Sequence, residues 1–351
     1  GKEPVLGRNQ LVLDLCNPAV RDYIVQNVSE ILDQAQIDYV KWDMNRHIGD
    51  CCSSHVRDQG EFFHRYILGL YDVLKRIFGP RPHILLESCS SGGNRFDLGM
   101  LCFSPQVWAS DDTDPVERLK IQGGLSYLYP LSTMGAHVSE APHQQTLRNT
   151  PLATRFHAAC FGCLGYELDL KFLSFVEKRE VKNQIAFYKK HRKTFQYGRF
   201  YRFQAHKENK VHWECAERDQ SKAVAGFFQT LSTASESYDM LPLAGLDPDA
   251  RYVVSSRPQS LFIKRFGGLV KHILPVTLHP EGWILRTANK LYCLTDCEEQ
   301  YEAFGDLLLS GIKLNNQFMG THYNNRTRLL GDFGSTMYVI EKKNISGEVS
   351  E

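Results

Sequence analysis

The stretch Tyr39-Val40-Lys41-Trp42-Asp43-Met44-Asn45-Arg46 begins with a short run suited to a β-strand. The run ends in the carboxylate of Asp43, and polar residues follow it. A helical pattern precedes it, because Asn17 followed by Pro18 suits an N-cap and a first helical position. The apolar residues after this cap recur at helical spacing: Val20, Ile24, Val28, Ile31 and Leu32. A helix that leads into such a strand is the repeating unit of parallel α/β folds.

The same alternation continues on both sides of this stretch. We expect an earlier strand at residues 10–15, and a helix at residues 63–77 that stops at Gly79-Pro80. Further strands are expected at residues 83–87 and 106–109, around 131–136, and around 165–170. About six consecutive βα units whose strands end in polar residues suit a closed barrel better than an open sheet. The sequence therefore predicts an α/β fold, an incomplete (β/α)8 TIM barrel over residues 1–198 that lacks its first two strands.

The pattern changes after a helical stretch at about residues 174–195, which ends at Gln196-Tyr197-Gly198. The later apolar runs are short and rich in β-branched and aromatic residues, at 211–213, 223–228, 252–254, 283–285 and 337–340. We therefore expect an all-β sandwich as a second domain over residues 199–351.

Composition excludes several classes of function. The 351 residues include 41 Lys and Arg against 40 Asp and Glu, without the basic surplus of a nucleic-acid binder or of a membrane-surface protein. No apolar run approaches the ~20 residues that a membrane-spanning helix needs. The start, Gly1-Lys2-Glu3-Pro4, has no signal core and no initiator Met, so we expect a fragment of a cytoplasmic protein. A neutral small molecule is the expected partner.

The 10 cysteines predict reduced, mostly buried thiols rather than a metal site, because no His or Cys cluster accompanies the Cys160 and Cys163 pair. A phosphate-binding loop is also absent, since the loop that contains Gly92 and Gly93 lacks the Lys-Ser/Thr ending. We expect neither a metal nor another cofactor.

Two aspartates follow apolar strands, where the catalytic groups of a barrel lie. Asp43 is flanked by the cations Lys41 and Arg46, which would keep a nucleophile ionised; the alternative is an Asp that caps the following loop. Asp111 begins a cluster with Asp112 and Asp114, whose charges must influence one another's protonation as a proton donor requires.

Asp114 stands directly before Pro115 with Glu117 three positions on, which predicts a helix cap, whereas spacing alone leaves the role of Asp112 open.

Retaining glycoside hydrolysis needs two carboxyl groups about 5 to 5.5 Å apart. Two strand ends separated by one strand can converge in this way.

Three further features favour a pocket without deciding its ligand. The small-residue loop from Cys89 to Gly93 lets backbone approach a ligand closely, although a simple tight turn explains it equally well. Arg8 can donate to sugar hydroxyls or be a solvated surface residue. His137 stands at a strand end, where it lines a pocket or serves as a hydrogen-bonded structural histidine.

Taken together, these tracts resemble glycoside hydrolase family 36 α-galactosidases in order and spacing. The resemblance rests on Lys41-Trp42-Asp43-Met44-Asn45-Arg46, Cys89-Ser90-Ser91-Gly92-Gly93 and Trp108-Ala109-Ser110-Asp111-Asp112-Thr113-Asp114. It continues through residues 311–314, 317–321 and 331–335, which are similar to the C-terminal β domain of the family, so it covers essentially the whole chain.

The resemblance implies an exo-acting, retaining α-galactosidase that removes terminal α-galactosyl residues from galacto-oligosaccharides by double displacement, without a cofactor and as a homo-oligomer when full length. Asp43 would be the nucleophile and Asp111 the general acid/base. The implied substrate-binding residues are Arg8, Lys41, Trp42, Asn45, Cys89, Ser90, Ser91 and Gly92.

The chain departs from the family in three ways. Asp112 stands where the family often has Asn, and Ser91 where it often has Gly. The family's N-terminal β domain and first two barrel strands have no counterpart, so we expect the chain alone to be unstable or inactive. A galactosyl-transferring transglycosylase of the raffinose-synthase type and a non-catalytic sugar-binding remnant remain as alternatives.

Overall fold

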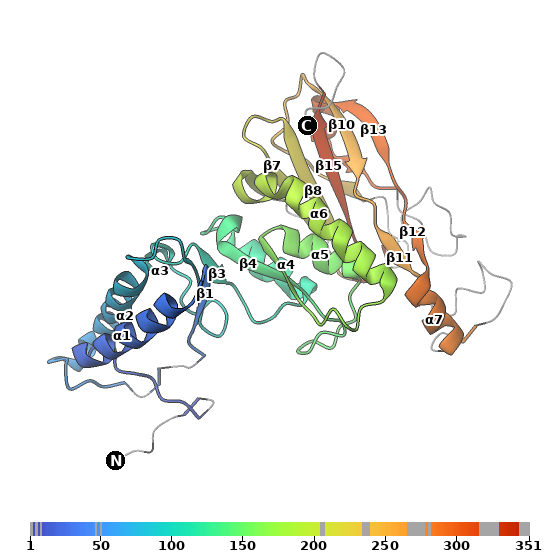
Figure 1. The fold of residues 1–351 in the computed structure, drawn as a ribbon. Coiled ribbons are helices and arrows are strands. Elements are labelled where there is room, and N and C mark those ends of the chain that lie inside the picture. The colour runs from blue at the N-terminus through green and yellow to red at the C-terminus, as the bar shows by residue number, and fades with distance from the viewer. Residues whose placement is uncertain are drawn as a thin grey trace. The chain divides into compact units, whose positions relative to one another are not determined.

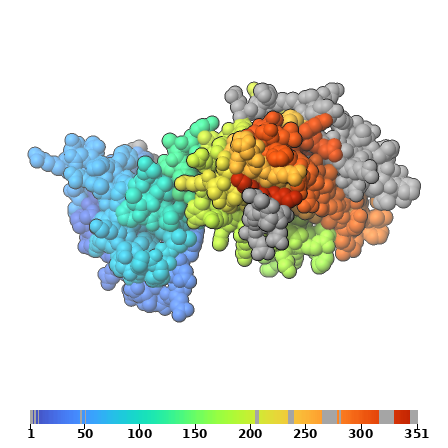
Figure 2. All heavy atoms as spheres, turned by 90° about the horizontal axis from the view of Figure 1, so that it is seen from above, coloured from blue at the N-terminus to red at the C-terminus, as the bar shows by residue number. Residues whose placement is uncertain are grey.

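The chain divides into two compact units, which Figure 1 shows as a ribbon and Figure 2 as space-filling atoms. Unit 1 comprises residues 1–111 and 133–135, and unit 2 comprises residues 112–132 and 136–351. The computed structural model describes residues 3, 6, 7, 9–45, 48, 49, 51–203, 208–233, 239–264, 278, 279, 282–315 and 330–343.

The start of α1 and the end of α2 lie where the sequence predicts. The Asn17 side chain accepts a hydrogen bond from the Ala19 amide, and Pro18 is the first residue of α1 (Pro18–Gln34). Helix α2 (Phe62–Phe78) stops at Gly79. The two helices pack side by side (Figure 1) and enclose a core in which Val73, Leu74 and Ile77 are fully buried.

Five strands form one sheet in the order β1-β2-β3-β4-β5. They are β1 (Tyr39–Asp43), β2 (Leu85–Cys89), β3 (Gln106–Trp108), β4 (Met134–Ser139) and β5 (Cys163–Glu167). The pairs β1-β2, β2-β3 and β3-β4 are parallel. Short helices η1 (Gln59–Glu61), α3 (Leu98–Leu101) and η2 (Leu131–Thr133) lie in the connections. The parallel α/β arrangement expected of an incomplete barrel is confirmed.

The strand expected at residues 10–15 is wrong. Residues 11–14 have no regular structure, and the chain turns at Leu15. The Asp14 side chain accepts hydrogen bonds from the Cys16 amide and from Ser53 Oγ, so it fixes a turn into α1 instead of a strand. The described residues therefore hold five strands of the parallel sheet rather than about six.

Unit 2 begins with α4 (Pro115–Leu125), α5 (Leu152–Cys160) and α6 (Phe175–Tyr197). A six-stranded antiparallel sheet follows in the order β13-β10-β15-β8-β7-β6, which confirms the predicted change from βα units to a β-rich domain. Its strands are β6 (Arg199–Phe203), β7 (Lys210–Ala216), β8 (Lys222–Gln229), β10 (Arg251–Ser256), β13 (Gln300–Phe304) and β15 (Ser335–Lys342). Two small sheets pair β9 (Met240–Leu241) with β14 (Ile312–Lys313) and β11 (Ser260–Phe262) with β12 (Cys293–Thr295).

Helices α5 and α6 pack on the six-stranded sheet, as Figure 1 shows. Polar bonds fix this layer, because Thr154 Oγ1 donates to the Phe333 carbonyl and His157 Nδ1 lies 2.8 Å from Ser335 Oγ. The sheet also carries α8 (Gly305–Leu309) beside β13.

The β-rich run expected at residues 283–285 is wrong, since it opens helix α7 (Trp283–Leu291). Leu285 is 1% exposed whereas Trp283 is 76% exposed. A strand would bury both, because side chains two positions apart share one face of a strand.

All ten cysteines are free, as predicted, but five of them are buried, so the expectation that most are buried is wrong. Among the residues that the structure describes, no group of three or more His, Cys, Asp or Glu side chains can hold a metal ion. The described helices include none that is long and apolar enough to span a membrane.

Candidate active site

The carboxyl ends of β1 and β2 place Asp43 directly beside Cys89 in the ladder. Because side chains alternate along a strand, Lys41 and Asp43 share one face of β1 and Trp42 points to the other. The Trp42 indole packs edge-to-face on Phe78 at a centroid distance of 6.1 Å, against the core of α1 and α2. Thus Lys41 and Asp43 face away from that helical core.

The carboxylate of Asp43 is held in its ionised form. Burial would raise its pKa, but hydrogen bonds from the Cys89 thiol and from Asn45, the charge of Lys41 and the Met44 amide together lower that pKa from its ordinary value. The Asn45 amide nitrogen lies 2.5 Å from Asp43 Oδ2. An ionised carboxylate is what a nucleophile requires.

Burial raises the pKa of the Cys89 thiol to about 11, with the neighbouring Asp43 charge acting in the same direction. The thiol therefore stays protonated at neutral pH and serves Asp43 as a donor. Cys89 Sγ–H is thus a hydrogen-bonding group of the site rather than a second nucleophile.

The loop after β2 connects Asp43 with Asp111. Asn45 Oδ1 accepts a hydrogen bond of 3.2 Å from the Ser91 amide. The φ angles of Ser91 and Gly92 are 47° and 85°, the left-handed region that permits this tight path. A Cβ atom added at Gly92 would lie 2.9 Å from Ser110 Cα and 3.3 Å from the Asp111 nitrogen. Gly92 therefore allows the loop to lie directly against the backbone at Asp111.

Asp111 is oriented by the strand that precedes it. The indole Nε1–H of Trp108 donates to Asp111 Oδ1 at 3.0 Å. On the same ring, Lys41 Nζ lies 4.9 Å from the centroid, within the range of a cation–π contact. Lys41 thus contacts β3 from β1, and the strand ends that carry the two aspartates are held together.

Glu87 is a member of this cluster that the sequence did not reveal. It is 3% exposed, and its carboxylate lies 3.4 Å from Lys41 Nζ and accepts hydrogen bonds from Gln106 Nε2 and from the Tyr39 hydroxyl. The ladder places Lys41 opposite Glu87. The pairing register of β1 and β2 is what brings Glu87 to Lys41. The sequence alone does not show this register, so it gives no signal for the Lys41–Glu87 pair.

Asp114 caps a helix, as the sequence predicts. It is completely buried, and its Oδ1 accepts hydrogen bonds from the Val116 and Glu117 amides at the start of α4 and from Arg148. Asp112 turns toward the same cap, since its Oδ1 accepts a hydrogen bond of 3.0 Å from the Asp114 amide. Within this acidic cluster, Asp111 accepts the Trp108 indole bond.

The remaining predicted residues lie elsewhere or outside the described part of the chain. Ser90 Oγ donates to the Met44 carbonyl, so its hydroxyl ties the loop to β1. His137 Nδ1 lies 3.5 Å from Glu167 Oε2 in unit 2. Arg8 lies outside the described residues, as do residues 317–321 of the C-terminal resemblance.

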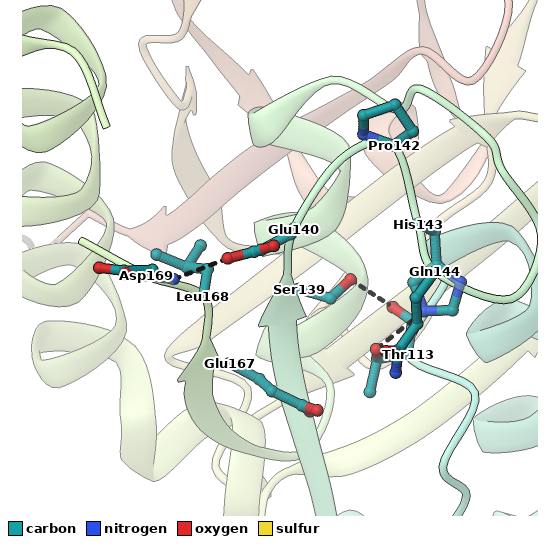
Figure 3. A pocket seen from close by; sticks show the side chains of 9 residues that line it. All are labelled: Thr113, Ser139, Glu140, Pro142, His143, Gln144, Glu167, Leu168 and Asp169. Carbon is teal, nitrogen blue, oxygen red and sulfur yellow. Dashed lines mark hydrogen bonds between the residues drawn. The ribbon is translucent and has the colours of Figure 1, made fainter. Parts of the chain in front are cut away.

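Unit 2 contains a pocket of about 330 Å³ at the loops after β4 and β5 (Figure 3). In Figure 3, Ser139 bonds the Thr113 carbonyl on one side, and Glu140 accepts the Asp169 amide on the other. Its lining residues include three carboxylates and the apolar side chains of a proline and a leucine: Thr113, Ser139, Glu140, Pro142, His143, Gln144, Glu167, Leu168 and Asp169. Carboxylates accept hydrogen bonds from hydroxyl groups and repel anions, so the lining of this pocket disfavours an anionic ligand.

The chain matches proteins of known family over most of its length. Residues 1–198 match the Melibiase family model, and residues 210–340 match the model of the glycosyl hydrolase family 36 C-terminal domain. Alpha-galactosidase AgaA of Geobacillus stearothermophilus is 49% identical over 251 residues, which are 71% of this chain and 34% of that protein. Alpha-galactosidase Mel36A of Lactobacillus acidophilus is 45% identical over 72% of this chain and 35% of its own length.

Solved structures agree with these matches. The α-galactosidase of Lactobacillus brevis superposes with a TM-score of 0.78 at 36% identity, over 98% of this chain and 40% of that one. AgaA in complex with raffinose gives a TM-score of 0.77 at 38% identity, over 97% of this chain and 40% of that one. The chain thus spans about a third of the length of the curated relatives it matches. It belongs to the Melibiase family, with a glycosyl hydrolase family 36 C-terminal domain.

Proposed function

We propose that this chain carries both catalytic carboxylates of a retaining, exo-acting α-galactosidase, with Asp43 as nucleophile and Asp111 as general acid/base. The substrates would be terminal α-galactosyl residues of oligosaccharides of the melibiose and raffinose type. The proposal assigns the catalytic domain to residues 1–198 and the β domain to residues 199–351. AgaA, a relative of this chain, is solved in complex with raffinose, which supports this substrate class.

One observation carries the proposal. An ionised carboxylate, Asp43, is linked through Asn45 and Ser91 to a loop whose Gly92 lies against the backbone of a second strand-end carboxylate, Asp111. Two carboxyl groups that face one sugar are what double displacement needs.

In the first step, Asp43 attacks the anomeric carbon and forms a galactosyl ester. The glycosidic bond breaks as Asp111 gives its proton to the leaving oxygen. In the second step, Asp111 takes a proton from water, the water oxygen bonds to the anomeric carbon, and Asp43 leaves as the free carboxylate. A sugar hydroxyl in place of water would give transfer instead of hydrolysis.

The proposed galactose contacts are the residues at the strand ends that carry Asp43 and Asp111. Lys41 is the cation of the site, Asn45 is both a donor and an acceptor, and the residues Cys89, Ser90, Ser91 and Gly92 supply the closely approaching loop. Arg8 completes the proposed set. The Trp42 indole packs on Phe78, so we leave Trp42 out of the sugar contacts.

The test separates the two aspartates by their chemistry. Asp111→Ala should cut hydrolysis of melibiose by about 10³-fold but spare the first-step release of phenolate from an aryl α-galactoside with a good leaving group, because that group needs no proton. Asp43→Ala should abolish turnover of both substrates. Equal losses for both variants on both substrates would contradict the proposal. Product analysis with an added acceptor sugar distinguishes hydrolysis from transfer.

The family resemblance also supports a cytoplasmic setting, a homo-oligomeric full-length protein and a reaction without a cofactor. We include these three points in the proposal. Size-exclusion chromatography with light scattering tests the oligomeric state.

A further inference from the structure

Arg95 lies in the connection between β2 and α3, and only 8% of it is exposed. Its Nη2 donates to the carbonyl of Cys89 at 2.6 Å and to the carbonyl of Trp42 at 3.1 Å. Trp42 directly precedes Asp43, and Cys89 is the ladder partner of Asp43. The guanidinium of Arg95 therefore joins the end of β1, where Asp43 lies, to the end of β2.

No carboxylate pairs with this buried cation among the described residues. The Nε of Arg95 is buried and has no hydrogen-bond partner within the same part of the chain. Burial lowers the pKa of Arg95, and the nearby Tyr66 and Asp43 act in the opposite direction. A buried, unpaired guanidinium is costly, so a fold that needed only stability would be expected to give it a carboxylate or to replace it by an apolar side chain.

We propose that Arg95 is a positioning residue, which fixes the ends of β1 and β2 so that Asp43 meets its donors and which supplies positive charge that keeps Asp43 ionised. The catalytic meaning of this role rests on the proposed function, because it requires Asp43 to be the nucleophile. Arg95 itself donates to protein carbonyls and not to the sugar.

Unit 2 uses the same kind of bond at other strand ends. Arg155 Nη1 donates to the Ser139 carbonyl at the end of β4, and Arg118 Nε donates to the Asp112 carbonyl after β3. Both arginines are buried. Arg95 differs from them because β1, one of the two strands that it joins, ends in Asp43.

The direct test is a pH titration of the Asp43 side-chain carboxyl carbon by NMR, assigned by the signal that disappears in Asp43→Asn. Arg95→Met should raise the titration midpoint of Asp43 by about half to one pH unit, because the charge and the strand clamp are both lost. Arg95→Lys keeps the charge and should shift the midpoint by less. Arg81→Met is the control for the loss of an arginine near β2. Arg81 also bonds a carbonyl, that of Ile77, but it pairs with Asp33 and lies before β2 rather than after it.

The second readout is the rate at which a slow 2-fluoro galactosyl fluoride labels Asp43 at saturating concentration. Arg95→Lys should slow labelling by about ten-fold and Arg95→Met by about a hundred-fold, with little change in the half-saturating concentration, because positioning affects the reacting geometry. If Arg95→Met labels at the unaltered rate, or if its Asp43 midpoint equals that of Arg81→Met, the proposal is wrong.

The two proposals fail in different ways. A label that survives in Asp43→Asn counts against the proposed function, whereas the titration reads Asp43 without any sugar. If Arg95→Met does not fold, Arg95→Lys tests the role of Arg95 instead. A labelling rate and an Asp43 titration midpoint of Arg95→Lys identical to those of the unaltered chain would overturn that role.

Discussion

Arg95 in unit 1 and Arg257 in unit 2 are both buried guanidiniums, but their surroundings differ. Arg257 is 3% exposed, its Nη2 lies 2.8 Å from Glu180 Oε1, and its guanidinium stacks 4.7 Å from the Phe156 ring centroid. Arg95 has two carbonyl partners and no carboxylate among the described residues. The pair Arg257–Glu180 neutralises itself within the layer between α6 and the antiparallel sheet.

This difference separates a cation that stabilises packing from a cation that serves a neighbouring site. The opposite charges of an ion pair largely cancel at a distance, whereas the field of an unpaired charge extends to ionisable groups nearby. The comparison predicts that removal of Arg257 lowers stability, and that removal of Arg95 mainly changes Asp43.

The largest effect is expected for Arg257→Met. Loss of one partner leaves the Glu180 carboxylate buried without its cation, which should cost about 3–5 kcal/mol in the free energy of unfolding. Denaturant unfolding measures this loss, and the double variant Arg257→Met/Glu180→Gln should recover part of it. A loss below about 1 kcal/mol would remove the basis of the comparison.

Glu214 extends the comparison to a buried carboxylate that has one donor. It is completely buried in β7, its Oε2 accepts the Ala244 amide at 2.6 Å, and its Oε1 has no partner within the described residues. Burial raises the pKa of Glu214 to about 8. Because this folded-state pKa is raised, the stabilising contribution is complete at acidic pH and is lost as the pH rises through about 8.

Glu214→Gln should therefore flatten the loss of stability that occurs as the pH rises toward about 8. Between pH 5 and pH 9 the unaltered chain should lose roughly 2–4 kcal/mol more than Glu214→Gln. Denaturant unfolding at the two pH values checks this, with the surface variant Glu208→Gln as control. Identical pH dependence of Glu214→Gln and the unaltered chain would show that Glu214 is already solvated or paired.

Arg95→Met should change stability much less than Arg257→Met. Two hydrogen bonds to carbonyls are lost, but the cost of burying an unpaired charge is removed as well, so the net loss should be about 1 kcal/mol. The same unfolding assay measures it. A loss as large as that of Arg257→Met would place both arginines in the same structural class.

The smallest effect is expected for Cys89→Ala. Removal of the thiol donor should raise the titration midpoint of Asp43 by a few tenths of a pH unit, roughly the effect of one weak hydrogen bond. Cys102→Ala is the control, because the exposed Cys102 thiol bonds the Leu98 carbonyl instead. A midpoint that falls in Cys89→Ala would mean that the thiol does not donate to Asp43.

The sequence predicts the parts of the site that depend on local pattern. A carboxylate directly after an apolar run identifies Asp43 and Asp111 as strand-end residues, and the Pro115 that follows Asp114 identifies the cap of α4. These signals are contained within a few consecutive residues, so no knowledge of packing is needed to interpret them.

The parts that depend on register or on distant partners could not be predicted. The ladder alone places Lys41 opposite Glu87, and Arg95 gains its meaning only when its guanidinium reaches the Trp42 carbonyl. Residues 10–15 looked like a strand because the competing bonds of the Asp14 side chain involve Ser53, far along the chain. Residues 283–285 looked like a strand because three consecutive apolar residues do not reveal which of them is buried.

The most direct test of the account is to treat the chain with a 2-fluoro galactosyl fluoride, digest it and locate the label by mass spectrometry. We expect one galactosyl unit on the peptide that contains Asp43, absent in Asp43→Asn and still formed in Asp111→Ala. A label on another residue, or a label that survives in Asp43→Asn, would contradict the assignment of Asp43 as the nucleophile.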